Sequence, residues 1–125
     1  MNASHIVCVT LPVRIVSEAN SRDHWRKASA RKKLHRACAH SMLLRHPLPA
    51  TAGKVTITMT RIAPRTLDDD NLASGFKATR DGIADWLGID DGSKRLRWVC
   101  EQRKGRQYAA EVVVSWEVEK DHAIF

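Results

Sequence analysis

The spacing of apolar residues along the chain predicts two strands in its first half. Residues 6–16 are rich in β-branched and aliphatic side chains and predict a first strand. Pro12 interrupts this strand and implies an edge position or a bend, because proline lacks the N–H group that a sheet interior needs. Residues 54–62 predict a second strand, in which every second residue from Val55 to Met59 is apolar and threonines lie between.

Two other segments show helical spacing. The first covers residues 22–46, and Pro47 and Pro49 end it. Its modestly apolar stripe consists of Ala30, Leu34, Ala37, Ser41 and Leu44. The second helix is expected between residues 70 and 87, with Gly88 at its C-terminal end. Its apolar stripe consists of Leu72, Phe76, Thr79, Ile83, Trp86 and Leu87.

Two further strands are expected at the C-terminal end, at residues 95–103 and 107–118. The short turn at residues 104–106 between them predicts a β-hairpin. The order is therefore strand, helix, strand, helix, strand, strand. A length of 125 residues with 43% hydrophobic content suits one compact domain and is too short for two. We therefore expect a single α+β domain over residues 1–125, with a small mixed sheet packed against helices.

The second helix carries two more faces of interest. Asp70, Ser74, Lys77 and Asp81 follow a spacing that places them on one outward polar face, suited to a reactive site. A third stripe beside it holds only small residues, namely Gly75, Ala78 and Gly82. Such a stripe allows another backbone to approach closely. The sequence leaves open whether that backbone belongs to the same fold or to a second copy in a dimer.

The charge balance points to a polyanionic partner. The formal net charge is +7, and the first helix alone carries eight basic residues against one acidic residue. A basic surface of this kind favours nucleic acid, because its phosphates release bound counterions on contact with Lys and Arg. An anionic membrane surface is the less favoured alternative. No stretch is long and apolar enough for a transmembrane helix, and no secretory signal is visible, so the sequence predicts a soluble, cytoplasmic protein.

Acidic residues are concentrated around the second helix. Seven of the fourteen Asp and Glu residues lie between positions 68 and 91. They include a first acidic group, Asp68, Asp69 and Asp70, and a second acidic group, Asp90 and Asp91. Taken separately, these groups fit a helix N-cap and a turn. Taken together they favour a metal site, because one cap needs only one acid. The pattern does not fit an EF-hand, and Mg²⁺ suits it best, with Mn²⁺ as a substitute.

With this arrangement, the chain resembles the RusA-like Holliday junction resolvases, endonucleases found in phages and prophages. The family signature is an Asp-x-Asp-Asn entering a helix, a lysine on that helix, and an Asp-Asp-Gly just after it. This chain carries it as Asp68-Asp69-Asp70-Asn71, Lys77 and Asp90-Asp91-Gly92. Residues 17–25 and 80–88 look like the phage branch of the family. The resemblance follows the order of the whole chain and implies a RusA-like fold.

The resemblance also implies roles for individual residues. Asp68, Asp70 and Asp91 would be the catalytic acids that bind the metal, with Asp90 as a neighbouring ligand and Asn71 orienting the site. The family lysine stands four residues after the second motif aspartate, where this chain has Ser74, and Lys77 lies one turn further along. Lys77 would either reach the scissile phosphate or form a structural pair with Asp81 at i+4.

Contacts with DNA are expected mainly from the basic helix. The predicted nucleic-acid-binding residues are Asn20, Arg22, His24, Arg26, Lys27, Arg31, Lys32, Lys33, Asn71 and Lys77. His24 lies at a helix start, where a structural role is the alternative. The four tryptophans, Trp25, Trp86, Trp98 and Trp116, are expected in the core rather than stacked on bases.

The expected function is therefore a Mg²⁺-dependent endodeoxyribonuclease that resolves four-way DNA junctions by paired symmetric cleavage. The resemblance implies a homodimer with one site per subunit, and a bacterial host cell in which the gene is carried by a phage or prophage. One or two metal ions are both compatible with the ligands. Two alternatives remain: a non-catalytic DNA-binding module of the same fold, or a nuclease that acts on other branched or single-stranded DNA.

Overall fold

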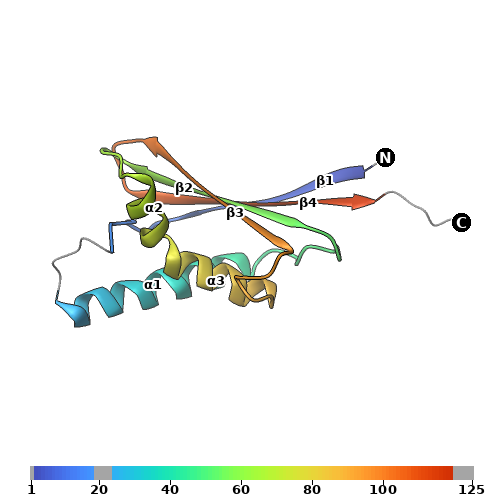
Figure 1. Cartoon of the computed structure of the whole chain (residues 1–125), viewed down its shortest axis with the longest axis horizontal. Coiled ribbons are helices and arrows are strands. Elements are labelled where there is room, and N and C mark those ends of the chain that lie inside the picture. Colours follow the sequence, from blue (N-terminus) through green and yellow to red (C-terminus); the bar gives the residue numbers. More distant parts are fainter. Residues whose placement is uncertain (1, 19–23, 120–125) are drawn as a thin grey trace, which may run out of the picture.

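The computed structural model describes the backbone of residues 2–18 and 24–119 and the side chains of residues 5–18 and 24–117. Figure 1 shows α1 and α3 side by side along one face of a sheet, with α2 at one end of α3. This arrangement confirms the α+β class and the mixed sheet. The elements are β1 (Asn2–Leu11), α1 (Trp25–Leu43), β2 (Val55–Ala63), α2 (Asp69–Gly75), α3 (Lys77–Leu87), β3 (Leu96–Lys104) and β4 (Ala109–Glu119).

The sheet has four strands in the order β1-β4-β2-β3. β4 pairs antiparallel with both β1 and β2, while β2 and β3 are parallel and are connected through α2 and α3. A parallel pair needs such a crossover, because its connection must return to the starting end of the sheet. β1 ends at Leu11, directly before Pro12, and lies at the edge of the sheet as predicted.

The predicted hairpin between the last two strands is wrong. β2 lies between β3 and β4, and the connection passes over the end of β2. There Gly105 donates its N–H to the Ala63 carbonyl at 3.0 Å, and a Cβ at Gly105 would lie 2.7 Å from Ile62 Cγ2. A short turn fixes only the length of a connection, and consecutive strands pair in only about two-thirds of cases. The valine-rich β4 takes one of the two interior positions, where it pairs with β1 and β2.

One apolar core lies between the sheet and its helices. β1, β2 and β4 contribute alternating residues that are buried, which is the pattern of a sheet with one covered face. The predicted apolar stripe of the second helix is confirmed, because all six of its residues are buried. Central members of the core are Val9, Leu11, Ile57, Met59, Leu72, Phe76, Ile83, Trp86, Val112 and Val114.

The predicted apolar stripe of the first helix is on the wrong face. Leu34 and Leu44 are 62% and 61% exposed, and the buried residues of α1 are instead His35, Ala39 and Leu43. The many charged residues of α1 leave little apolar contrast between its faces, so spacing alone did not identify the inward face. The helix also begins three residues later and ends three residues earlier than predicted, at Trp25 and Leu43.

The predicted second helix is divided into two by Phe76, which has φ −89° and ψ −5°. The preceding Gly75 packs so closely that a Cβ there would lie 2.5 Å from the Val16 carbonyl oxygen. Glycine weakens a helix interior, and this contact fixes the end of α2 at that point. Gly88, with φ 68°, closes α3 as predicted.

The small-residue stripe serves packing within the fold. A Cβ at Gly82 would collide with the carbonyl oxygen of Arg36 on α1. The absent side chain therefore lets α1 and α3 lie in direct backbone contact. This contact answers the question that the sequence left open between an internal neighbour and a dimer partner.

Among the residues that the structure describes, no helix is both long and apolar enough to cross a membrane.

Candidate functional site

The first acidic group stands at the start of α2. Asp68 is the N-cap, and its Oδ1 accepts the backbone N–H of Asn71 at 2.9 Å. The Asn71 side chain donates to Asp68 Oδ2 at 2.9 Å and accepts from the Ser17 hydroxyl at 2.7 Å. Asn71 therefore orients Asp68 and ties it to the segment after β1. Asp69 and Asp70 are exposed in the first turn, where carboxylates interact favourably with the helix dipole.

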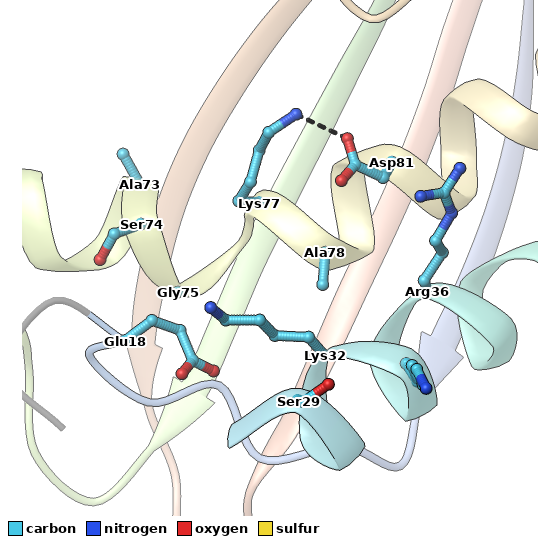
Figure 2. Close-up of a pocket in the computed structure, with 11 residues that line it drawn as sticks. Glu18, Ser29, Lys32, Arg36, Ala73, Ser74, Gly75, Lys77, Ala78 and Asp81 are labelled. Carbon is cyan, nitrogen blue, oxygen red and sulfur yellow. Dashed lines mark hydrogen bonds and ion pairs between the residues drawn. The ribbon is translucent and has the colours of Figure 1, made fainter. Parts of the chain in front are cut away.

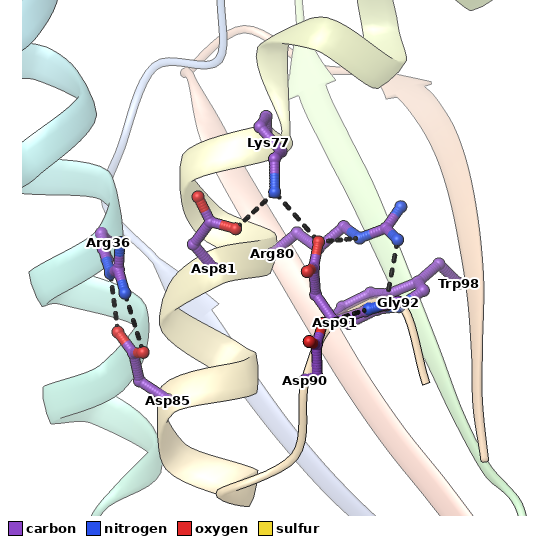
Figure 3. A network of polar contacts seen from close by, with 9 residues as sticks. All are labelled: Arg36, Lys77, Arg80, Asp81, Asp85, Asp90, Asp91, Gly92 and Trp98. Atoms are coloured by element: carbon purple, nitrogen blue, oxygen red, sulfur yellow. Dashed lines mark hydrogen bonds and ion pairs between the residues drawn. The ribbon is translucent and has the colours of Figure 1, made fainter. Parts of the chain in front are cut away.

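Asp91 in the second acidic group contacts two cations from α3 (Figure 3). Its Oδ2 lies 2.9 Å from Lys77 Nζ and 3.2 Å from Arg80 Nε. Its backbone carbonyl accepts the indole N–H of Trp98 at 2.8 Å and a guanidinium N–H of Arg80 at 3.1 Å. The hydrogen bond from Lys77 holds the pKa of Asp91 below its usual range. Asp91 is thus fixed at both its side chain and its backbone.

Lys77 is the first residue of α3 and bridges two carboxylates. Besides Asp91, its Nζ contacts Asp81 Oδ1 at 2.6 Å, so the expected i+4 pair is present. The hydrogen bonds that Lys77 donates to Asp81 and, second in effect, to Asp91 raise the pKa of Lys77. The Lys77 side chain is 60% exposed, so the ammonium group is open to a ligand from solvent. We call Lys77, Arg80, Asp81 and Asp91 the polar cluster.

Asp90 has a local turn contact. Its Oδ1 accepts the N–H of Gly92 at 2.9 Å, as expected for the turn alternative. Within the described residues, no three His, Cys, Asp or Glu side chains are grouped so that they could hold a metal ion. The carboxylate donors suit Mg²⁺ chemically, but the described arrangement does not assemble them, because Asp91 faces Lys77 and Arg80 and Asp68 caps α2.

Two members of the site were not identified from the sequence. Arg80 lies three residues after Lys77 and hence on the same helix face, which was the available signal. Trp98 was expected in the core, and it does pack against the core, but its indole N–H also holds the Asp91 carbonyl. The Arg80 guanidinium lies over the Trp98 ring, 4.7 Å from its centroid. This stacking joins the two side chains into one support for Asp91.

A groove of about 700 Å³ lies between α1 and the α2–α3 pair (Figure 2). Its charged lining residues are Glu18, Lys32, Lys33, Arg36, Lys77 and Asp81. Lys77 and Asp81 also belong to the polar cluster, so the groove and the cluster adjoin. Two of the predicted DNA-contacting lysines of α1 therefore face the same space as the predicted catalytic lysine.

The other residues in or beside α1 that were predicted to contact DNA differ in their exposure and in their partners. Arg31 forms a two-pronged ion pair with Glu18 at 2.6 and 2.8 Å, and both side chains are mostly buried. Arg26 and Lys27 are exposed. His24 is the N-cap of α1, and its Nδ1 accepts the N–H of Arg26 at 3.2 Å. The predicted contacts Asn20 and Arg22 lie outside the described residues.

The core placement predicted for Trp25 is wrong. Its side chain is 68% exposed, and the Arg26 guanidinium lies 5.2 Å from its ring centroid. The other three tryptophans are buried or partly buried. Their positions follow apolar registers, whereas Trp25 stands at the first turn of a helix whose surroundings are charged. An exposed tryptophan beside cations is a known means of stacking on a nucleobase.

Comparison with known proteins finds a similar protein but does not indicate an activity for this chain. No protein-family model matches this chain. An uncharacterized protein from Xylella fastidiosa is 42% identical over 79 residues, which cover 58% of this chain and 51% of the relative. The chain therefore spans about half the length of this relative.

Proposed function

We propose that this protein is a metal-dependent endodeoxyribonuclease that acts on branched DNA, with four-way junctions as its substrate. The observation that carries the proposal is the position of the polar cluster at the side of a cationic groove. Lys77 and Asp81 line the groove, and Lys77 contacts Asp91 at 2.9 Å. Acidic and basic groups beside a phosphate-binding surface are the parts that phosphodiester hydrolysis requires.

Substrate binding follows from charge. The net charge of +7 favours a polyanion, and the groove lining holds four cations against two carboxylates. Phosphates entering the groove would release their own condensed counterions on contact with Lys32 and Lys33, which gives affinity without sequence preference. Lys77 is protonated at neutral pH, and its two carboxylate partners raise its pKa further. Its ammonium can therefore neutralise charge on a phosphate beside the cluster.

The residues proposed to hold Mg²⁺ or Mn²⁺ are Asp68, Asp70, Asp90 and Asp91. The described arrangement does not gather them, so metal binding would require Asp91 to leave Lys77 and Arg80. A divalent ion bound there would supply charge neutralisation and a water made nucleophilic at neutral pH. Asn71 fixes the carboxylate of Asp68 through its Nδ2 contact at 2.9 Å. Arg80 and Trp98 fix the backbone of Asp91. These contacts limit the motion of two of the proposed ligands.

The proposal includes a homodimer, because two symmetric cuts in a four-way junction need two sites. It also places the protein in the cytoplasm of a bacterial cell and its gene on a phage or prophage. Support for these points comes from the resemblance of the sequence motifs to the RusA-like resolvases. The dimer is testable separately by light scattering, with and without junction DNA.

The test is cleavage of a labelled, mobile four-way junction by the purified full chain with Mg²⁺, Mn²⁺ or EDTA. Asp70→Asn and Asp91→Asn are compared with Asp85→Asn, a control on α3 whose carboxylate pairs with Arg36 outside the cluster. We expect paired symmetric nicks that require metal, Asp70 and Asp91 but not Asp85. Asp70→Asn should keep or increase junction affinity, because it removes a negative charge.

Other outcomes would redirect the proposal. Tight junction binding without cleavage under any metal would identify a non-catalytic DNA-binding module. Cleavage of flaps or single strands in preference to junctions would keep the nuclease and change its substrate. Metal-dependent cleavage that survives both Asp70→Asn and Asp91→Asn would overturn the assignment of the site.

A further inference from the structure

The floor of the groove is unusually open and apolar for a charged surface. It is formed by Ala73, Gly75 and Ala78, which carry no side chain larger than a methyl group. Figure 2 shows Lys32 extending from α1 toward Gly75, with Ser29 on the same helix beside it. The methyl group of Ala78 leaves this space free, whereas the small size of Gly75 serves its close packing against the Val16 carbonyl. The result is a channel with an apolar floor and cationic sides.

The cations of the groove are not equally available. The two carboxylates in its lining are each neutralised, since Glu18 pairs with Arg31 and Asp81 pairs with Lys77. Among the residues described, Lys32 and Lys33 form no ion pair, and both are exposed. These two lysines are therefore the surplus positive charge of the groove. A phosphodiester backbone is the ligand that such a pair of cations fits.

Trp25 extends the same surface toward the start of α1. At 100° per residue, positions 25, 29, 32, 33 and 36 lie within about one-third of the helix circumference. Trp25 thus stands one turn before Ser29 on the groove side of α1, and its ring is 68% exposed. An exposed tryptophan can stack on a base only if that base is unpaired or at the end of a duplex.

The dimensions of the groove bear on whether its occupant is a single strand or a duplex. A volume of about 700 Å³ lies in the range of about 300–1,000 Å³ that holds small ligands, so it admits a few nucleotides and no double helix. The walls are also held close, because α1 and α3 meet in backbone contact at Gly82. Both observations favour a single strand as the occupant of the groove.

We infer that this groove is a binding site for an unpaired DNA strand, with phosphates on Lys32 and Lys33 and a base stacked on Trp25. The inference rests on the proposed function in that the substrate is DNA. It adds that the site engages an unpaired segment next to the polar cluster. A strand in the groove would lead its backbone past Lys77, which lines the groove and contacts Asp91.

The test is binding of a fluorescent octamer of thymidine to the full chain, measured by anisotropy in EDTA so that no cleavage occurs. Lys32→Glu with Lys33→Glu is compared with a charge-matched control, Lys54→Glu with Lys104→Glu, at exposed positions that do not line the groove. We expect the groove pair to lose at least tenfold more affinity than the control pair. Its salt dependence should also be shallower by about 1.4 in the log–log slope, at about 0.7 for each lost phosphate contact.

Trp25→Ala provides an independent arm. It should weaken binding of the thymidine octamer roughly tenfold and leave binding of an abasic octamer of deoxyribose phosphate unchanged, because only a base can stack. Circular dichroism of each variant checks that it is folded. Equal losses in the groove pair and the control pair, or equal affinity for an octamer duplex, would overturn the inference. So would equal weakening of both octamers by Trp25→Ala.

The binding assay tests the groove and the cleavage assay tests the nuclease, so either hypothesis can be disproved without the other. A chain that cleaves junctions but binds octamers equally well with and without Lys32 and Lys33 disproves the groove assignment alone. A chain that shows the predicted octamer binding but never cleaves disproves the nuclease alone.

Discussion

Lys77 Nζ and Asp91 Oδ2 lie 2.9 Å apart although the two residues are fourteen positions apart in the sequence. This contact joins the first residue of α3 to the loop that follows the same helix. The pair is exposed enough for solvent to screen it, so its contribution to stability is small, at about 0–1 kcal/mol. Its importance lies in placement, because it holds one cation and one carboxylate at the side of the groove.

Lys77→Met should therefore reduce activity far more than stability. We expect cleavage to fall by about 10²-fold, the usual cost of one lost charge-stabilising donor. The free energy of unfolding should change by less than about 1 kcal/mol. The measurements are single-turnover junction cleavage and urea unfolding. Lys94→Met, at an exposed lysine with no assigned role, is the control. Equal activity in the two variants would show that Lys77 is only the i+4 partner of Asp81.

Trp98→Phe tests the support behind Asp91. The replacement keeps an aromatic ring under Arg80 and removes the N–H that donates to the Asp91 carbonyl at 2.8 Å. We expect stability to fall by about 1 kcal/mol and cleavage to fall several-fold under conditions where the variant is fully folded. Trp116→Phe is the matched control, since Trp116 is buried in the core away from this contact. Unchanged cleavage per folded molecule in Trp98→Phe would remove Trp98 from the site.

The sequence predicts the inward face of an element only where apolar and polar residues are clearly separated on its two faces. The apolar stripe of α3 is dense and was placed correctly, whereas α1 turns His35 and Ala39 inward and exposes Leu34. The eight basic residues of the predicted helix left too little contrast between its faces to identify the inward one. The hairpin was mispredicted because a turn specifies connection length, and the pairing of β4 with β2 depends on contacts across the whole sheet.

In the site too, contacts set by local spacing were predictable, whereas contacts between residues distant in the sequence were not. The N-cap at Asp68 and the pair of Lys77 with Asp81 depend on local spacing and were open to prediction. The contact of Lys77 with Asp91 depends on the helix break at Phe76 and on the path of the loop, which no local pattern specifies. For that reason the joining of the two acidic groups into one site stays a prediction, and the direct contacts of Asp91 with Lys77 and Arg80 were not predicted.

Gly82→Ala should destabilise the protein, although alanine favours helices. The new Cβ would collide with the backbone carbonyl of Arg36, which no rotamer change can relieve. Overpacking of this kind costs about 1–3 kcal/mol, which outweighs a propensity gain of at most about 1 kcal/mol. The measurement is the urea midpoint. Gly92→Ala is the control, because its Cβ would have Asp90 Oδ1 at 3.5 Å as its nearest contact and should shift stability by less than about 0.5 kcal/mol. A more stable Gly82→Ala would argue against direct contact between α1 and α3.

His35 should make the fold sensitive to mild acid. Its side chain is 2% exposed, and its Nδ1 has no hydrogen-bond partner in the described part of the chain. Burial lowers its pKa, an effect that Glu18 opposes and Arg31 reinforces. The unfolded chain therefore takes up a proton at His35 near pH 6.5 while the folded chain does not. Stability conferred by neutral His35 is complete above that pH and decreases as the pH falls toward the folded-state pKa, by up to about 1.4 kcal/mol per pH unit.

The measurement for His35 is the free energy of unfolding between pH 7.5 and pH 5, a window above the range where most carboxylates titrate. His35→Leu removes the titrating group, so the stability of this variant should fall less steeply with acid than that of the unmodified chain. His5→Leu, at an exposed histidine, should keep the steep fall. Only slopes are compared, because each substitution also changes packing. Parallel curves for the unmodified chain and His35→Leu would mean that His35 is protonated equally in the folded and unfolded states. That result would contradict its burial as a neutral side chain between α1 and the core.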